Sequence, residues 1–309
     1  MTGERTGGVC VVGSLNIDST LVVSALPTAG QTVLARERHT SPGGKGANQA
    51  VAAAAVGSRV RFVGAIGDDA DGRLGLATLA GRGIDVSDVL VLEAVPTGTA
   101  VVVVDDRGEN LIVVDAGANG RLDDAWTARA VTAGDDAVLL AQLEVPVDAL
   151  LAAAGAWQGR WFVLNPAPMG DAGEIARLLP AVDVLVPNRT ELGELVGRPT
   201  PHTTEEVQAC AEALAFEGTL VVTLGGDGAA VFAPGGRLVE HVPAPTVDVV
   251  DTSGAGDAFC GVLAHELTRT GGDVVPAVRV AVELAAASTR HLGAQVPPSF
   301  GSASETVPS

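Results

Sequence analysis

The chain is poor in cysteine and in basic residues, and both shortages limit what it can be. Its three cysteines, Cys10, Cys210 and Cys260, lie far apart without a CxxC pair, so we expect buried, reduced thiols and no disulfide framework. The five histidines show no HxxxH or HExxH spacing, which argues against a structural zinc site. The 19 basic residues against 37 acidic ones give a net charge of −18, which argues against a nucleic-acid partner.

Long hydrophobic runs are also missing. No apolar segment reaches the roughly 18 residues of a transmembrane helix, so we expect no membrane partner. The N-terminus, residues 1–8, is polar and lacks the apolar stretch of a signal peptide, which makes the cytoplasm the expected location. With 309 residues, 47% of them hydrophobic, the chain can supply the core of one large domain, with or without a small appendage, or of two domains.

Lysine is almost absent. Lys45 is the only lysine among the 19 basic residues. A coding bias toward arginine on solvated surfaces explains the other positions. Because a compact, flexible ammonium group is not equivalent to a planar guanidinium, the one retained lysine indicates a position that requires it.

Short β-rich runs alternate with helical stretches along most of the sequence. The expected strands are 9–12, 59–66, 137–140, 161–164, 184–186 and 220–224. The expected helices are 45–56, 73–81, 147–156, 204–216, 255–270 and 274–291. This alternation predicts an α/β fold with a parallel sheet and helices on both faces.

Two regions, about 18–38 and 97–114, have β character without intervening helices. They predict a small separate sheet, whose edges would be exposed unless it covers a cleft or pairs with another copy. We therefore expect a flexible N-terminus over residues 1–8, a single α/β domain over 9–295 that carries this sheet, and a flexible tail over 296–309.

The strongest local motif is the segment 251–257, Asp-Thr-Ser-Gly-Ala-Gly-Asp, which opens an apolar helix. Gly254, Ala255 and Gly256 let backbone N–H groups approach a ligand, and the helix N-terminus adds partial positive charge, so an anion such as phosphate can be held there. Asp257 follows in the first turn. It either complements the helix dipole or acts as a base toward a substrate hydroxyl, and the segment alone leaves both interpretations open.

A second glycine-rich turn, 43–49, also enters a helix. It is not a Walker A loop, because Gly46 follows Lys45 and the GxxxxGK[ST] spacing is absent. Lys45 and Asn48 at such a turn suit hydrogen bonding to a polyhydroxylated ligand, although a plain helix start is the alternative.

Polar residues follow several predicted strands. Asn16 and Asp18, two apart in an extended segment, face the same side and can bind adjacent hydroxyls, although both are also ordinary turn residues. Further polar strand ends occur at 142–144, 165–168, 187–191 and 223–228. Because parallel strands end at one edge of a sheet, a nucleotide and a second substrate are expected along this edge.

Taken together, these motifs resemble those of the ribokinase family, also called the PfkB carbohydrate kinases, from about residue 9 to residue 295. The resemblance implies a three-layer α/β/α sandwich with a mainly parallel sheet and a small β lid over about 18–38 and 97–114. The motifs at 13–18, 43–50, 142–144, 165–168 and 187–191 are closer to kinases of ribose than to kinases of fructose or adenosine. The implied activity is ATP-dependent phosphorylation of the 5-hydroxyl of D-ribose to give ribose 5-phosphate.

The resemblance also implies roles for individual residues. Asp257 would deprotonate the sugar hydroxyl, and Gly254, Ala255 and Gly256 would form an anion hole for the phosphoryl group. The implied sugar ligands are Asn16, Asp18, Gly44, Lys45, Gly46, Asn48, Glu144 and Asp257. The implied ATP-binding residues are Asn188, Glu191, Thr223, Gly225, Gly226, Asp227, Gly228 and Gly256, with Asn188 at the phosphates and Glu191 organising Mg²⁺ through water.

Two further features are implied by the resemblance. A monovalent cation, usually K⁺, would be bound at the carbonyl positions Asp251, Ser253, Ser288, His291 and Gly293. The lid would pair two subunits into a homodimer. The chain departs from the family at Pro297, where relatives often have serine near the cation, and near Val282, where relatives often place asparagine or histidine against adenine.

Other functions remain open at this point. The motifs also suit a kinase for deoxyribose, fructose or adenosine, because one hydroxyl contact can decide selectivity. A catalytically silent sugar-binding regulator is a further alternative, which the intact Asp257 and its glycine-rich loop argue against. A dinucleotide-binding oxidoreductase is disfavoured because no GxGxxG follows the first strand.

Overall fold

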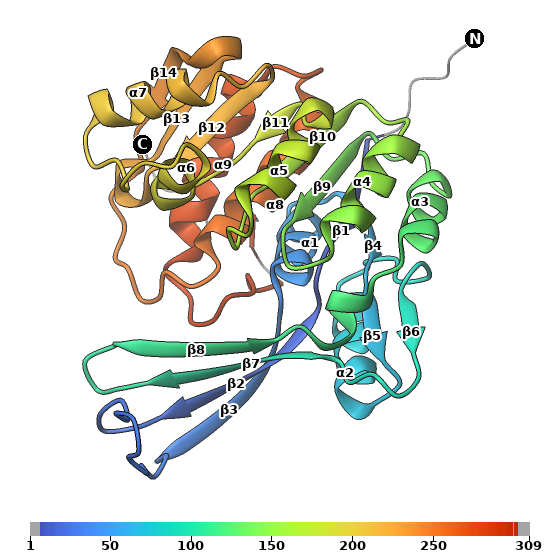
Figure 1. Ribbon diagram of the computed structural model, residues 1–309, viewed down its shortest axis with the longest axis vertical. Helices are drawn as coiled ribbons and strands as arrows, with labels where there is room; N and C mark the ends of the chain where they lie inside the picture. Colours follow the sequence, from blue (N-terminus) through green and yellow to red (C-terminus); the bar gives the residue numbers. More distant parts are fainter. Residues whose placement is uncertain (1–6, 299, 302–309) are drawn as a thin grey trace.

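An eight-stranded sheet forms the centre of the computed structural model, which describes residues 7–298, 300 and 301 (Figure 1). The strand order is β14-β13-β12-β11-β10-β9-β1-β4, and the six strands from β12 to β4 in this order are parallel to one another. The antiparallel β13 and β14 complete one edge. The strands are β1 (Gly8–Val12), β4 (Arg59–Val63), β9 (Val138–Gln142), β10 (Trp161–Asn165), β11 (Val184–Leu185), β12 (Thr219–Thr223), β13 (Ala229–Ala233) and β14 (Arg237–Val242).

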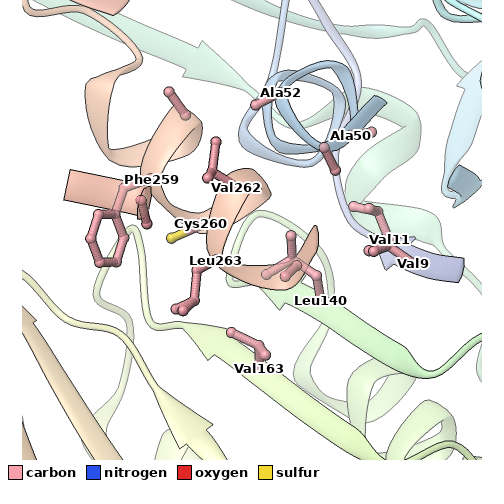
Figure 2. Packing of buried hydrophobic residues seen from close by; sticks show 14 of the residues in the cluster. Val9, Val11, Ala50, Ala52, Leu140, Val163, Phe259, Cys260, Val262 and Leu263 are labelled. Atoms are coloured by element: carbon pink, nitrogen blue, oxygen red, sulfur yellow. The ribbon is translucent and has the colours of Figure 1, made fainter. Parts of the chain in front are cut away.

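Helices cover both faces of this sheet because successive side chains of a strand point to opposite sides. On one face Val9 and Val11 pack with α1 (Lys45–Ala55), α8 (Ala255–Arg269) and α9 (Val274–Ser288), and Figure 2 shows part of this cluster. On the other face Cys10 and Val12 pack with residues of α3 (Asp124–Thr132), α4 (Val147–Ala156), α5 (Ala172–Leu178), α6 (Arg189–Leu195) and α7 (Thr204–Leu214). The predicted α/β fold with two helical layers is confirmed. The three cysteines are free and buried.

A few elements differ from those expected. The expected strand 59–66 is split into β4 and β5 (Ala65–Gly67), which pairs with β6 (Leu90–Leu92). The break falls at Gly64, where the backbone of Gly13 approaches so closely that a Cβ would lie 2.7 Å from its carbonyl oxygen. The helix α2 (Ala70–Gly81) starts three residues earlier than expected, because the side chain of Asp69 caps it by accepting from the backbone N–H of Gly72.

The two β regions without helices pair with each other in a four-stranded sheet that projects from the main body (Figure 1). Its order is β3-β2-β7-β8, and its strands are β2 (Asn16–Val22), β3 (Glu37–Gly43), β7 (Gly98–Val104) and β8 (Asn110–Asp115). The chain passes from β1 into β2 through three residues, 13–15. The small sheet therefore starts directly at the edge where β1 ends.

The ends of the chain differ in part from the expectation. Residues 1–6, 299 and 302–309, most of the two segments expected to be flexible, lie outside the described residues. Gly8 already belongs to β1 and pairs with Arg59. In the expected tail, Val296 and Phe300 are instead buried, because both side chains are apolar and join the core cluster that also contains residues of α1, α8 and α9. Across the described ranges, no helix combines the length and apolar character needed to cross a bilayer.

Candidate functional site

Asp257 lies in the first turn of α8 and is buried, with 7% of its surface exposed. Its Oδ2 accepts a hydrogen bond from Asn48 Nδ2 at 3.1 Å, and its Oδ1 accepts one from Gln49 Nε2 at 3.0 Å. Both donors belong to α1. The residue at the N-cap position of α8 is Gly254, which has no capping side chain. The Asp257 carboxylate is thus held by side chains of a neighbouring helix instead of capping its own.

Electrostatic coupling links this carboxylate to the only lysine. Burial raises the pKa of Asp257 and outweighs the opposing effects of the Lys45 charge and the two amide hydrogen bonds. Burial alone would lower the pKa of Lys45, but the negative charges of Asp257, Glu144 and Glu191 together raise it. Lys45 is therefore a cation surrounded by carboxylates, and Asp257 is a stronger proton acceptor than a solvated aspartate.

A cavity of about 130 Å³ lies in front of Asp257. It is lined by Lys45, Asn165, Ala167, Val186, Asn188, Glu191, Thr223, Gly254, Gly256, Asp257 and Cys260. The first N–H groups of an α-helix have no acceptor inside the helix and attract anions. In α8 the N–H of Ala255 donates to the carbonyl of Thr252 at 3.3 Å, so in this conformation one of the three expected donors, Ala255, is engaged within the protein.

Further carboxylates lie on β2 and just after β9. Glu144 Oε2 accepts from the backbone N–H of Lys45 at 2.9 Å and from the hydroxyl of Ser14. Burial and the nearby charge of Glu144 raise the pKa of Asp18 to about 6. The buried Oδ1 of Asp18 has no hydrogen-bond partner among the described residues. Two neighbouring acidic groups, one with an unused acceptor, suit a ligand rich in hydroxyl groups.

Asn16 is oriented by a residue distant in sequence. Asn119, in the 3-10 turn Gly117–Arg121, donates from Nδ2 to Asn16 Oδ1 at 2.7 Å and accepts from the backbone N–H of Leu15 at 3.0 Å. The hydrogen bonds of Asn119 therefore hold the motif at 13–18 in place before any ligand binds.

A second cavity of about 510 Å³ adjoins the first and shares Thr223 and Gly256 with it. It is lined by Thr223, Gly225, Gly226, Gly228, Ala244, Pro245, Thr246, Val247, Val249, Thr252, Ala255, Gly256, Phe259, Val282, Ala285, Ala286 and Thr289. This mostly apolar lining and this size suit a nucleoside. The expected residues Thr223, Gly225, Gly226 and Gly228 all line it, and so does Val282.

The carboxylate of Asp227, an expected nucleotide contact, is held by another residue of the protein. Its carboxylate accepts from Arg189 Nη2 at 2.6 Å, and the same arginine donates to the carbonyl of His202 at 3.0 Å. The carbonyl of Asp227 lies 2.8 Å from His241 Nε2. These contacts hold the turn Gly225–Asp227 in place, so Asp227 acts on the larger cavity through the turn and does not line it.

Asn188 and Glu191 form the capping box of α6. Glu191 Oε2 accepts from the backbone N–H of Asn188 and its Oε1 accepts from Asn188 Nδ2, both at 2.8 Å. Burial raises the pKa of Glu191, opposed by the Asn188 N–H and the Lys45 charge. Both residues line the smaller cavity beside Asp257.

The positions expected around a monovalent cation come together from two segments. The carboxylate of Asp251 accepts from the backbone N–H groups of Ser253 at 2.8 Å and Gly293 at 2.9 Å, and the N–H of Asp251 donates to the carbonyl of Thr289 at 3.0 Å. In this conformation the carbonyl of Ser288 accepts from the N–H of His291 at 3.1 Å. Segment 251–253 therefore lies against segment 288–293. Within the described part of the chain, no three His, Cys, Asp or Glu side chains are grouped as metal ligands.

Three residues with contacts in the site, Ser14, Gln49 and Asn119, were not expected from the sequence. Gln49 follows Asn48 in the second motif, which is the only signal that pointed toward it. Ser14 likewise lies within the motif at 13–18, but Asn119 has no such signal, because its role arises from a contact with Asn16, more than a hundred residues away.

Comparison with known proteins places these features in a family. The model of the pfkB family carbohydrate kinases matches residues 7–299. A ribokinase of Arabidopsis thaliana is 36% identical over 267 residues, which cover 82% of this chain and 69% of that protein. A deoxyribokinase of Salmonella typhi is 35% identical over 292 residues, which cover 93% and 94%. The solved structure of Arabidopsis thaliana ribokinase complexed with ribose and ATP superposes with a TM-score of 0.79 at 31% identity, covering 95% of each chain.

The chain belongs to the pfkB family of carbohydrate kinases. It is a sugar kinase, and therefore a phosphotransferase. The resemblance drawn from the motifs and the fold that it implied are confirmed.

Proposed function

We propose that the chain transfers the γ-phosphoryl group of ATP to the 5-hydroxyl of D-ribose. The observation that carries this proposal is the placement of Asp257. It is buried between amide donors at a helix N-terminus, and it lines a small cavity that adjoins a nucleoside-sized one. The ribose- and ATP-bound relative, similar over nearly its whole length, supports the choice of both substrates.

In this proposal each part of the site has one role. The nucleoside of ATP occupies the larger cavity, and its phosphates extend past Thr223 and Gly256 into the smaller one. Asp257 takes the proton of the 5-hydroxyl as that oxygen attacks the γ-phosphorus. The bond between this phosphorus and the β–γ bridging oxygen breaks, and ADP leaves. Lys45 and the N–H groups at the start of α8 stabilise the negative charge on the transferred group.

Sugar recognition rests on acceptors that the protein itself leaves unpaired. Asp18 Oδ1 and Asn48 Oδ1 are buried and lack partners among the described residues. A buried acceptor without a donor costs about 1–3 kcal/mol, and sugar hydroxyl groups are donors that remove this cost. The implied set of Asn16, Asp18, Gly44, Lys45, Gly46, Asn48 and Glu144 surrounds the place where the small sheet meets the body. We assign this sheet, β3-β2-β7-β8, as a lid whose closure excludes water.

The residues present fit two metal ions. Both oxygens of Glu191 are occupied by Asn188, so Mg²⁺ would be held near them through water and by the phosphates of ATP. Its chemistry would be to neutralise phosphate charge. K⁺ would be held by carbonyl oxygens of segments 251–253 and 288–293, which the Asp251 carboxylate ties together. A cation there would stabilise the start of α8.

Deoxyribose is a second candidate substrate, because a deoxyribokinase is 35% identical over nearly the whole chain. The two sugars differ by a single hydroxyl. A site with buried acceptors for hydroxyl groups rejects an analogue that lacks one, since the acceptor is then left unpaired. We assign one of the two unpaired acceptors, Asp18 Oδ1 or Asn48 Oδ1, to the 2-hydroxyl, and on that assignment the site favours ribose.

Release of ADP from ATP, measured with D-ribose, 2-deoxyribose, fructose and adenosine in turn, tests this assignment. We expect the highest kcat/KM with D-ribose, and faster turnover in potassium than in sodium-only buffer. A higher kcat/KM with 2-deoxyribose would transfer the assignment to that sugar. Sugar binding without ADP release would indicate a silent regulator, and equal rates in the two buffers would contradict the cation site.

The lid also suits pairing of two copies into a homodimer. Its edge strand β8 has four consecutive apolar residues, Leu111 to Val114, that are 47% to 69% exposed. An edge strand with this composition is covered when it pairs with another sheet. We expect a dimer by light scattering and a monomer after Val113→Lys. Val239→Lys, on the exposed edge strand β14, should leave the dimer intact, and a monomeric wild type would refute the pairing.

A further inference from the structure

A row of buried side-chain amides lies beneath Asp257. Gln142 Nε2 donates to Gln49 Oε1 at 2.6 Å, and Gln49 Nε2 donates both to Asp257 Oδ1 at 3.0 Å and to Asn165 Oδ1 at 3.2 Å. Asn165 Nδ2 in turn donates to the backbone carbonyl of Val186 at 2.9 Å. Gln49 and Gln142 have no exposed surface. The row joins α1, β9 and β10, the residue that follows β11, and α8.

The direction of every hydrogen bond in this row follows from its last member. A backbone carbonyl only accepts, so Asn165 must present its NH₂ group to Val186 and its oxygen to Gln49. Gln49 must then present its NH₂ group to Asn165, and the second N–H of that group reaches Asp257. With the amide of Gln49 reversed, its oxygen would face two acceptors. Gln49 is therefore locked as a donor to the carboxylate.

We propose that Gln49 is a positioning residue for the reaction, which holds the Asp257 carboxylate in one rotamer and keeps it ionised. This inference rests on the proposed function of the site. Asn48 donates to the other carboxylate oxygen, so two neighbouring residues of α1 hydrogen-bond both oxygens of the base. Asn48 also carries an unpaired acceptor suited to the sugar, whereas the amide of Gln49 is fully used by the protein.

The expected effect of removing Gln49 has a definite sign. Its hydrogen bond favours the charged form of Asp257, so its loss raises the pKa of that carboxyl group. The base acts only when ionised, and the acid limb of the kcat/KM profile therefore moves to higher pH. A hydrogen bond to a charged group corresponds to a shift of about one to two pH units. The other groups facing the carboxylate are Lys45 of α1, Glu144 after β9, Glu191 of α6 and Cys260 of α8, and all four remain in the variant.

The pH dependence of kcat/KM, measured for the wild type, Gln49→Met and Gln142→Met, tests the proposal. Gln49→Met keeps the side-chain length and removes both donors. The acid limb of its kcat/KM profile should therefore move to higher pH, while the KM for the sugar changes less than twofold. Gln142→Met breaks the same row at its far end. It leaves the hydrogen bond from Gln49 to Asp257 intact. The acid limb of its kcat/KM profile should therefore stay within a few tenths of a pH unit of the wild-type position.

An unshifted acid limb in a folded, less active Gln49→Met enzyme would overturn the proposal, as would an equal shift in Gln142→Met, because both indicate general damage to the row. If Gln49→Met does not fold, Gln49→Glu carries the test. Glutamate has the same shape as glutamine and places a second carboxylate beside Asp257. The acid limb of the kcat/KM profile of this variant should therefore move to still higher pH. Absence of sugar-dependent ADP release in the wild type would refute the proposed function itself, whereas a wild-type profile in an active Gln49→Met enzyme would refute only the role of Gln49.

Discussion

Replacing Asp257 by asparagine is expected to lower kcat by about 10²–10⁴-fold, the usual contribution of a general base. The amide has nearly the same volume as the carboxylate, so the buried position at the start of α8 stays filled. It has no basic oxygen that can take the proton of the attacking hydroxyl. Steady-state ADP release under saturating sugar and ATP measures the loss.

The matched control is Asp171→Asn, which makes the same chemical change at the N-cap of α5. Asparagine caps a helix as well as aspartate does, so this variant should keep both its melting temperature and its kcat. Turnover of Asp257→Asn within a few-fold of the wild type, in a protein of normal Tm, would show that Asp257 only complements the helix.

The second large effect is expected from Gly254→Ala, which should lower kcat/KM by on the order of 10²-fold or more, the share of a lost transition-state donor. Gly254 has a φ of 72° and immediately precedes α8. An added Cβ would lie 2.1 Å from the carbonyl oxygen of Ala294 and 2.7 Å from its Cα. Backbone atoms cannot relieve a clash by changing rotamer as a side chain can, so the start of α8 must move. Gly256 and Asp257 move with it.

Gly271→Ala is the control that distinguishes the steric clash with Ala294 from the strain of a left-handed backbone. Gly271 has a φ of 63°, and a Cβ there meets no heavy atom within 4 Å. Both variants bear the left-handed strain of about 1–2 kcal/mol, so both should lose some thermal stability. Only Gly254→Ala should lose activity. Equal activity in the two variants would mean that the approach of Ala294 to Gly254 does not set the geometry of the anion hole.

Much of the fold was predictable from the sequence because buried parallel strands and amphipathic helices leave strong periodic signals. The helix 147–156 was expected with the bounds that the structure has. The short helices α3, α5 and α6 were missed, since seven to nine residues give too few turns to show a period. Each starts after an Asp or Asn cap, which is the one local signal available.

The candidate site was predictable where a motif itself carries the chemistry. Lys45, Asn48 and Asp257 were expected from composition and spacing, and the structure brings them together. The sequence alone could not separate the two interpretations of Asp257, because the contacts that favour the role of a base come from α1, more than two hundred residues away. The partner of Asp227, Arg189, lies 38 residues away in another element and was also not foreseen.

The central claim is that this site phosphorylates the 5-hydroxyl of ribose, and the most direct measurement is ³¹P NMR of the product formed from ATP. With D-ribose, we expect sugar-dependent ADP release and one new phosphomonoester signal at the 5-position. With 5-deoxy-D-ribose, which keeps the other hydroxyl groups but lacks the acceptor, we expect neither. A phosphate at another position, or equal ADP release with both sugars, would contradict the account.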